Sequence, residues 1–286
     1  MIDFQNVSFS YGEESSGGGI RNVNLTINTG EFVLLTGESG CGKTTITRLV
    51  NGLVPHYYEG NLEGDVLLDG KSVSDTPLYD LAAMVGSVFQ NPKSQFFNVD
   101  TDSELAFACE NLGYPQEDIL KRIDRTVSDY HIEDLMGRSV FALSGGEKQK
   151  IACASSSVLL PGIMVLDEPS SNLDMAAIDD LRQVLSLWKK QGKTILIAEH
   201  RLYYLHDLAD RVLYVKDGEI EREYTPAEFD SLSDGTRKEM GLRPFSLSKL
   251  KPANQYQAHT AKQMEFQNFC FAYKKREPES LHAGGR

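Results

Sequence analysis

Residues 37–44 read Gly-Glu-Ser-Gly-Cys-Gly-Lys-Thr, and no other segment constrains the fold of this chain as strongly. The segment fits the phosphate-binding pattern G-x-x-x-x-G-K-[ST]. An apolar run, residues 32–35, precedes it, and a helix-compatible stretch, residues 44–51, follows it. A strand, a glycine-rich loop and a helix in this order predict a nucleotide-binding α/β fold.

The chemistry of this loop follows from its residue types. Its three glycines let successive backbone N–H groups turn inward and form a nest for phosphate oxygens, and the helix that starts near Lys43 adds its positive end. Lys43 is then expected to reach the β- and γ-phosphates, and the Thr44 hydroxyl to ligate Mg²⁺. The alternative is a glycine-rich turn that contains a lysine by chance.

Composition excludes several classes of partner. Of the 286 residues, 41% are hydrophobic, and 29 basic against 41 acidic residues give a net charge of −12. A general electrostatic attraction to nucleic acid or anionic lipid is therefore not expected, and a local basic patch stays open as the alternative. No apolar run reaches the roughly 18 residues that a membrane span needs. The four cysteines show no paired spacing, so free thiols in a reducing cytoplasm are expected.

Strand patterns alternate with helix patterns along most of the chain. Alternating apolar residues predict strands within the first thirty residues, and a turn signal at Asp69-Gly70 predicts a further strand pair. Residues 102–135 have a helical pattern. Later apolar strands alternate with helices and predict a parallel sheet, with strands at 163–166, 194–197 and 211–215 and helices at 175–190 and 202–209. A capped short helix should begin at Thr225.

One internal repeat is present. Residues 2–11 read IDFQNVSFSY and residues 264–273 read MEFQNFCFAY, with five of ten positions identical. The first copy is followed by the phosphate loop 26 residues after Tyr11, whereas only 13 residues follow Tyr273. We therefore expect a first domain at 1–240, a linker at 241–263, and at 264–286 the start of a truncated second domain. The alternative is two unrelated amphipathic strands.

Two carboxylates end the apolar strand at 163–166. In a parallel sheet the ligand crevice lies at the carboxyl ends of the strands, where the phosphate loop also lies. Asp167 is placed to hold Mg²⁺, and Glu168 to polarise an attacking water as a general base. An acidic loop without catalytic function is the alternative.

Two further polar residues follow apolar strands. A neutral imidazole at His200 could hydrogen-bond a γ-phosphate, and the Gln90 amide could ligate Mg²⁺ and position water. A structural histidine and an ordinary turn residue are the alternatives.

The segment Leu143–Gln149, LSGGEKQ, supplies a second helix start suited to an anion. Two such starts, about a hundred residues apart, suggest that both serve one nucleotide. A capped helix after a flexible loop is the alternative.

Taken in order, these motifs resemble the nucleotide-binding domain of the ABC ATPases. The resemblance covers residues 1 to about 230, and Tyr11 matches the aromatic residue that stacks on adenine. It implies an α/β P-loop NTPase with a mostly parallel core sheet, an N-terminal antiparallel β subdomain and an inserted helical subdomain at about 90–159. It also implies ATP and Mg²⁺ as cofactors.

The resemblance assigns roles residue by residue. The catalytic residues would be Glu168, His200 and Gln90, and the Mg²⁺ ligands Thr44, Gln90 and Asp167. The nucleotide would be contacted by Tyr11, Gly37, Glu38, Ser39, Gly40, Cys41, Gly42, Lys43, Thr44 and Thr45, and from a paired domain by Ser144, Gly145, Gly146, Glu147 and Asp174.

A narrower resemblance comes from residues 89–96, FQNPKSQF, which are similar to the F-Q-N-P-x-x-Q segment of energy-coupling factor (ECF) transporter ATPases. The segment 199–202, EHRL, also resembles that group, particularly its members with two ATPase domains on one chain. This implies a peripheral subunit at the cytoplasmic face of the membrane. Its partners would be a transmembrane coupling subunit and a substrate-binding membrane subunit for a vitamin or transition-metal ion, with no direct contact between this chain and that substrate.

Family members pair head to tail and sandwich two ATP molecules, so the resemblance also implies a second ABC ATPase domain, either another copy or a paralogue. Two alternatives stay open: a soluble ABC ATPase that acts on another macromolecule, and an inactive truncated fragment of a tandem ATPase. An inactive module would be expected to lack Lys43, Glu168 or His200, and the sequence retains all three.

Overall fold

The computed structural model describes residues 1–12 and 18–245. The second copy of the repeat, residues 264–273, and most of the expected linker lie outside these residues. The described chain remains packed as far as Phe245, which is fully buried against Phe229 and His206. This packed segment extends five residues beyond the expected domain end at residue 240.

The N-terminal strands form an antiparallel sheet in the order β2-β1-β4-β5. Its strands are β1 (Ile2–Tyr11), β2 (Ile20–Ile27), β4 (Gly60–Leu68) and β5 (Lys71–Ser72). The turn between β4 and β5 has positive φ at both Asp69 and Gly70, which confirms the turn expected there. Alternate apolar residues of β1 are buried, so one face of this sheet covers the core.

The second sheet has six strands in the order β10-β9-β3-β8-β7-β6. They are β3 (Phe32–Thr36), β6 (Val85–Val88), β7 (Ile163–Asp167), β8 (Thr194–Ala198), β9 (Arg211–Lys216) and β10 (Glu219–Tyr224). Every neighbouring pair is parallel except β9 and β10. The predicted parallel α/β core is confirmed, and it places the carboxyl ends of β3, β8, β7 and β6 side by side.

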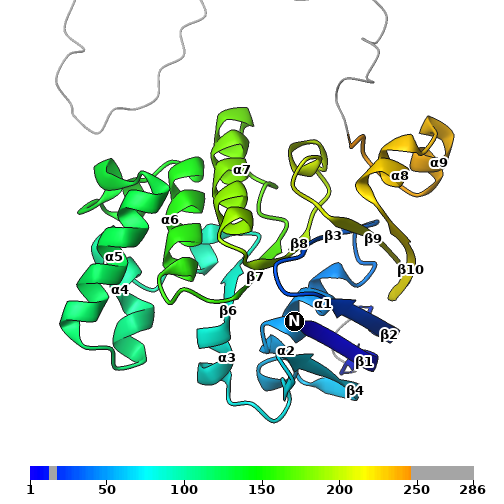
Figure 1. Cartoon of the computed structure of the whole chain (residues 1–286), viewed down its shortest axis with the longest axis horizontal. Coiled ribbons are helices and arrows are strands. Elements are labelled where there is room, and N and C mark those ends of the chain that lie inside the picture. The colour runs from blue at the N-terminus through cyan, green and yellow to red at the C-terminus, as the bar shows by residue number, and fades with distance from the viewer. Residues whose placement is uncertain (13–17, 246–286) are drawn as a thin grey trace, which may run out of the picture. The chain divides into compact units, whose positions relative to one another are not determined.

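Helices cover both faces of the parallel sheet (Figure 1). The helix α1 (Lys43–Val50) lies between the two sheets, with the short α2 (Leu53–His56) and α3 (Leu78–Met84) nearby, and α7 (Met175–Lys190) covers the opposite face. Neighbouring residues of β3 point to opposite faces of the sheet. Leu34 packs in the cluster that contains Trp188, and Leu35 packs in the cluster that contains residues of α1. The sheet is thus buried on both sides, as its uninterrupted apolar strands require.

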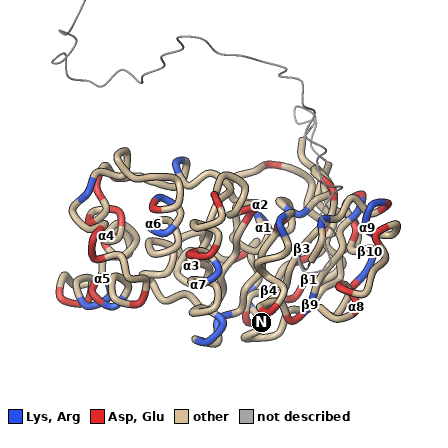
Figure 2. The backbone as a smooth tube through the Cα atoms, turned by 90° about the horizontal axis from the view of Figure 1, so that it is seen from above, with Lys and Arg blue, Asp and Glu red and all other residues tan. Residues whose placement is uncertain are grey.

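The helical subdomain consists of α4 (Thr101–Asn111), α5 (Gln116–Tyr130) and α6 (Gly145–Ser157), with single 3-10 turns at Pro92–Ser94, Glu133–Leu135 and Val140–Ala142. These elements lie at one end of the molecule, drawn in green in Figure 1. Figure 2 shows acidic and basic residues interspersed along α5 and around α8 and α9. Both signs occur along α5, whereas the charged residues of α4 (Asp102, Glu104 and Glu110) are all acidic.

The segment after β8 differs from expectation. A helix was expected at 202–209, but the structure has one 3-10 turn, Tyr203–Leu205. The physical reason is a buried carboxylate: Glu199 accepts hydrogen bonds from the backbone N–H of His200 and from the Tyr204 hydroxyl, and so ties the chain into a tight turn. The C-terminal helices are α8 (Pro226–Ser231), which has the expected capping box at Thr225, and α9 (Asp234–Glu239).

A buried hydrogen-bonded cluster joins the helical subdomain to the α/β core. The hydroxyl of Tyr130 in α5 accepts a hydrogen bond from Trp188 Nε1 in α7 and pairs with Ser157 Oγ in α6. Tyr130 is 5% exposed, and burial raises the pKa of its hydroxyl well above the ordinary value, so the group stays neutral.

We expect Tyr130→Phe to lower the free energy of unfolding by about 1–3 kcal/mol, because the buried Trp188 N–H loses its acceptor. The measurement is the urea midpoint of the purified chain. Tyr57→Phe is the matched control, since Tyr57 is 71% exposed and should leave the midpoint unchanged. Equal midpoints for Tyr130→Phe and the wild-type chain would contradict a stabilising cluster.

Candidate nucleotide site

The loop between β3 and α1 is built on glycines that no other residue can replace. Gly37 has φ +149° and Gly42 has φ +110°, both in the region that disfavours side chains. A Cβ at Gly37 would lie 2.1 Å from the carbonyl oxygen of Val215. The loop therefore lies directly on β9, and its backbone is fixed in a curled path before α1 begins at Lys43. Its crest, residues 38–40, is exposed.

Lys43 is 4% exposed, and its side chain folds back across the loop. Its ammonium donates to the carbonyl oxygens of Gly37, at 2.9 Å, and Glu38, at 2.8 Å. It also lies 3.6 Å from Cys41 Sγ, and Cys41 in turn accepts a backbone hydrogen bond from Gly218 at its carbonyl oxygen. The loop thus holds a buried positive charge within reach of any phosphate bound to its backbone.

Thr44 and Asp167 are brought together by the strand order. Thr44 Oγ1 donates to Asp167 Oδ1 at 3.2 Å, across 123 residues of sequence. Burial raises the pKa of Asp167, and the Thr44 hydrogen bond and the charges of Arg48 and Lys43 oppose this effect. Hydroxyl and carboxylate oxygens are hard donors of the kind that Mg²⁺ selects. The side chains present therefore fit a magnesium ion bound together with nucleotide phosphates.

Glu168 lies between two polar side chains from other elements. Gln90 Nε2 donates to Glu168 Oε2 at 3.1 Å, and His200 Nε2 lies 3.1 Å from Glu168 Oε1. The contact with His200 is the largest effect that lowers the pKa of Glu168, and partial burial opposes it. The carboxylate is therefore anionic near neutral pH and available as a proton acceptor.

Tyr11 lies beside the helix that follows the loop. Its hydroxyl is 3.2 Å from Thr45 Oγ1 and accepts a hydrogen bond from Arg48 Nη1 at 3.0 Å. The Arg48 guanidinium also stacks on the Tyr58 ring, 4.0 Å from its centroid. Sequence reasoning missed Arg48. Its spacing, four residues after Thr44 on one helix, was the only signal that it borders this site.

The segment 144–147 lies at the start of α6 and not at the phosphate loop. Ser144 caps α6 and forms a capping box with Glu147, and these contacts lower the pKa of Glu147 to about 2. Asp174 caps α7 by accepting a hydrogen bond from the Ala177 N–H at 2.9 Å. A Cβ at Gly146 would lie 2.7 Å from that of Ala177, so the starts of α6 and α7 pack closely together.

The site residues therefore form two groups in one chain. In the described part of the chain, no hydrogen bond or ion pair joins residues 144–147 to residues 37–45. Figures 1 and 2 both show α6 and α1 on different sides of α7. The first group surrounds the phosphate loop, and the second group lies at the starts of α6 and α7, where Gly145 borders a cavity of about 500 Å³ together with Gln90.

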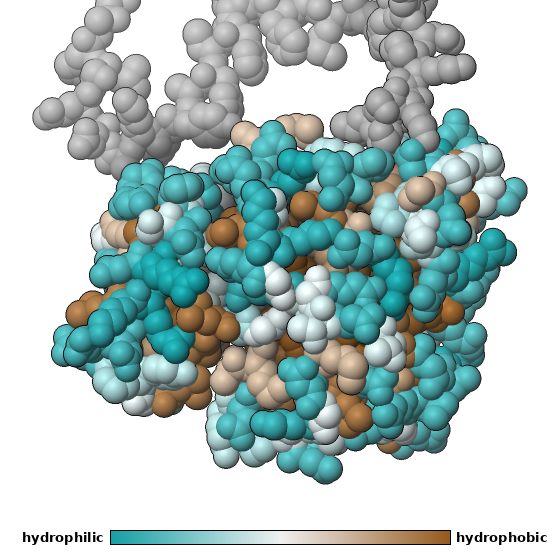
Figure 3. Space-filling model, viewed as in Figure 1, coloured by the Kyte–Doolittle hydropathy of each residue, from teal (hydrophilic) through white to brown (hydrophobic). Residues whose placement is uncertain are grey.

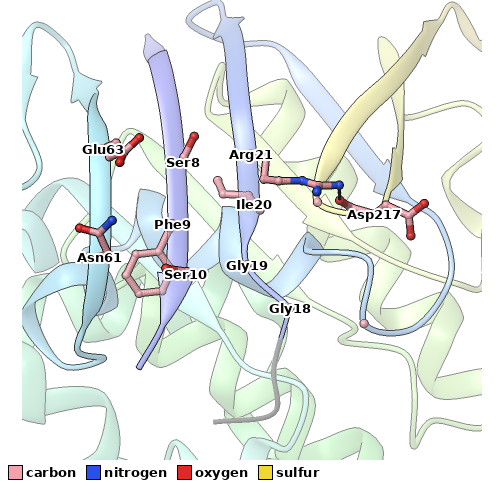
Figure 4. A pocket seen from close by; sticks show the side chains of 12 residues that line it. Ser8, Phe9, Ser10, Gly18, Gly19, Ile20, Arg21, Asn61, Glu63 and Asp217 are labelled. Atoms are coloured by element: carbon pink, nitrogen blue, oxygen red, sulfur yellow. Dashed lines mark hydrogen bonds between the residues drawn. The ribbon is translucent and has the colours of Figure 1, made fainter. Parts of the chain in front are cut away.

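Two cavities border the loop. One, of about 660 Å³, lies on the outer face of the antiparallel sheet, where Ser8 and Ser10, Asn61 and Glu63, and Arg21 project from three strands (Figure 4). It reaches the loop only at Gly40. The other, of about 820 Å³, is bordered by Thr44, Asp167 and Gln90 and extends to Phe97 of the helical subdomain. Of the catalytic candidates, Gln90 borders the second cavity, and its amide donates to Glu168.

Comparison with known proteins gives a consistent result. Residues 20–171 match the family model described as ABC transporter. A putative ABC transporter ATP-binding protein of Treponema denticola is 47% identical over 88% of this chain and 51% of its own length. One from Pyrococcus abyssi is 40% identical over 80% of this chain and 81% of its own length. The chain thus spans about half the length of the Treponema denticola relative.

Two solved structures share the fold. CbiO1 from Clostridium perfringens, described as part of the ABC transporter complex CbiONQ, superposes with a TM-score of 0.71 at 27% identity, over 83% of this chain and 93% of its own. The ATP-binding cassette MJ0796, solved as a dimer in a post-hydrolysis state bound to ADP and Pi, gives a TM-score of 0.68 at 26% identity, over 79% of this chain and 99% of its own.

Proposed function

The chain belongs to the ABC transporter ATP-binding proteins, and from this premise we propose that it hydrolyses ATP to power a membrane importer of the energy-coupling factor type. The observation that carries the proposal is the Glu168 carboxylate, held between Gln90 and His200 next to the phosphate loop. The ABC cassette binds ATP with Mg²⁺, and this chain has residues suited to each part of that ligand.

Glu168 acts as the general base. Its anionic oxygen accepts a proton from water as the water oxygen bonds to the γ-phosphorus, and the bond to the leaving ADP oxygen breaks. The Gln90 amide and the His200 imidazole fix the direction of the carboxylate. His200 would also donate to the γ-phosphate when ATP is bound. Lys43 neutralises phosphate charge.

Magnesium, when bound, would neutralise negative charge that develops on the phosphate oxygens. Thr44 and Asp167 would hold it, with Gln90 as a third ligand from the border of the same cavity. Tyr11 would stack on the adenine ring.

The separation of the two groups supports a shared site. The segment 144–147 forms no hydrogen bond or ion pair with the phosphate loop of its own chain, so Ser144, Gly145, Gly146 and Glu147 would serve the nucleotide of a second ABC ATPase domain, either another copy or a paralogue. Asp174 starts the helix beside them and would lie at the same contact. The dimeric state of the MJ0796 cassette supports this arrangement.

A membrane partner would dock on the helical subdomain next to Gln90. Phe97, Val99 and Phe141 are 74%, 64% and 77% exposed there, and Figure 3 shows apolar surface at this end of the molecule. The backbone of the Phe97 loop is held by the buried carboxylate of Glu104, which accepts hydrogen bonds from the N–H groups of Phe97 and Asn98. A rigid apolar surface of this kind suits a protein partner.

The proposed assembly contains a transmembrane coupling subunit and a substrate-binding membrane subunit. No described helix of this chain is long and apolar enough to cross a bilayer. This chain would act as a peripheral subunit at the cytoplasmic face. The imported compound, a vitamin or a transition-metal ion, would contact the membrane subunits and not this chain. The F-Q-N-P-x-x-Q segment and the likeness to CbiO1 support this type of importer.

Subcellular fractionation tests the assignment. We expect the tagged chain in the membrane fraction, from which alkaline carbonate should release it. The double variant Phe97→Glu with Phe141→Glu should reduce the membrane-bound fraction by roughly ten-fold, because charge opposes burial at an apolar contact. Leu120→Glu, at a 53% exposed position on α5, is the control. Recovery of the wild-type chain with ribosomes or DNA would instead indicate a soluble ABC ATPase.

A further inference from the structure

Glu199 is a buried carboxylate with no place in the proposed chemistry. It is 1% exposed and accepts four hydrogen bonds. One oxygen takes the backbone N–H groups of His200 and Arg201, at 2.8 and 3.0 Å, and the other takes the Ser170 N–H, at 3.3 Å, and the Tyr204 hydroxyl, at 2.8 Å. It therefore ties the backbone beside His200 to the backbone that follows Glu168.

Arg201 ties the same two segments from the other side. Its guanidinium donates to the carbonyl oxygen of Leu173 at 2.9 Å and reaches that of Ser171 at 3.5 Å. The planar guanidinium is suited to contact two acceptors at once. The segment 169–173 is thus fastened at Ser170, Ser171 and Leu173 by residues that flank His200.

The segment 169–173 constrains the backbone conformation of Glu168, the proposed base. Glu168 has φ +45°, a conformation that costs a non-glycine residue on the order of 1–3 kcal/mol and persists only where the surroundings enforce it. The Ser171 N–H donates to the Glu168 carbonyl oxygen at 3.2 Å, and the Glu168 N–H donates to the Ala198 carbonyl oxygen at 2.8 Å. Residues that hold 170–173 therefore hold Glu168.

We propose that Arg201 and Glu199 are positioning residues that fix the Glu168 carboxylate against His200 by fastening segment 169–173 to the strand end at His200. The inference rests on the proposed function, because it assumes that Glu168 is the base. Neither residue borders the two cavities beside the phosphate loop. A loss of either loosens the Glu168 backbone and misdirects its carboxylate, and nucleotide binding at the phosphate loop continues.

Arg201→Gln tests the proposal in the full-length chain. We expect kcat for ATP hydrolysis to fall by at least about ten-fold with KM within about twofold, since small misplacement of a reacting group costs rate and not affinity. Arg201→Lys retains the positive charge but not the planar guanidinium that donates to two acceptors, so it should recover part of the rate. Arg182→Gln is the matched control, because Arg182 makes a surface ion pair with Asp207.

Hydrogen exchange supplies a readout that is independent of activity. In Arg201→Gln, exchange of the amides of Ser171 and Leu173 should rise by about ten-fold or more, and in Arg182→Gln it should not change. Unchanged exchange, or raised exchange with an unchanged kcat, overturns the proposal. A fall in kcat that is matched by lost ATP affinity also overturns it.

Two outcomes separate this inference from the proposed function. If the wild-type chain hydrolyses no ATP, the proposed function fails, and exchange at 171–173 still decides whether Arg201 fastens the segment. If Arg201→Gln does not fold, Arg201→Lys and Glu199→Gln are measured in its place. A lower kcat with unchanged KM in either supports positioning, and wild-type kinetics in both overturn it.

Discussion

Glu168→Gln is expected to lower the rate of ATP hydrolysis by on the order of 10²–10⁴-fold, because the amide cannot accept a proton from water. The change is nearly isosteric, and the amide oxygen can still accept the hydrogen bond from Gln90. The nucleotide contacts at the phosphate loop are not altered, so ATP affinity should stay within about twofold. Steady-state phosphate release and equilibrium binding of ATP measure the two quantities separately.

If the paired domain is a second copy of this chain, the same variant should accumulate a closed dimer with ATP bound, because the step that separates the copies no longer occurs. Light scattering after size exclusion, with and without Mg²⁺ and ATP, measures the mass. Glu117→Gln is the control, since Glu117 makes an exposed ion pair with Lys121 on α5. An unchanged steady-state rate in Glu168→Gln would show that another group activates the water.

Local signals predicted much of this site. The phosphate loop, the carboxylates at the end of β7 and the helix start at 143–149 are each defined by a few neighbouring residues, so one stretch of sequence contains the whole signal. The helix at 175–190 was also predicted with the bounds that the structure has, and in the structure Asp174 caps its start.

The pairing of side chains was not predictable in this way. Glu168 meets Gln90 and His200 because β7 lies between β8 and β6, and this strand order is fixed by the packing of helices on both faces of the sheet. Arg201 and Glu199 were seen only as part of a family-like segment. The proposed positioning by Arg201 depends on the backbone carbonyl oxygens of residues 171 and 173, and backbone oxygens leave no signal in the sequence. The 3-10 turn at 203–205 was missed because it depends on the burial of the Glu199 carboxylate, which local sequence does not indicate.

Lys43→Ala is expected to weaken ATP binding and lower hydrolysis, each by on the order of 10²-fold, because the loop loses the one ammonium that its fold buries beside the phosphate position. The ammonium also bridges the carbonyl oxygens of Gly37 and Glu38, so its removal leaves both without that donor. Lys71→Ala, at an exposed position of β5, is the control. Wild-type affinity in Lys43→Ala would show that the loop does not hold the phosphates.

Lys43→Ala also tests whether two copies share the site. Ser144→Arg should abolish hydrolysis by placing a bulky side chain at the start of α6, while its phosphate loop stays intact. In a dimer of one Lys43→Ala chain and one Ser144→Arg chain, one composite site combines an intact Lys43 with an intact Ser144, and the other site has lost both. An equimolar mixture should therefore recover about a quarter of the wild-type rate, since half of the randomly formed dimers are mixed and each has one working site. No recovery, with an active wild-type chain, would mean that copies of this chain do not complete each other's sites and that its partner domain is a paralogue.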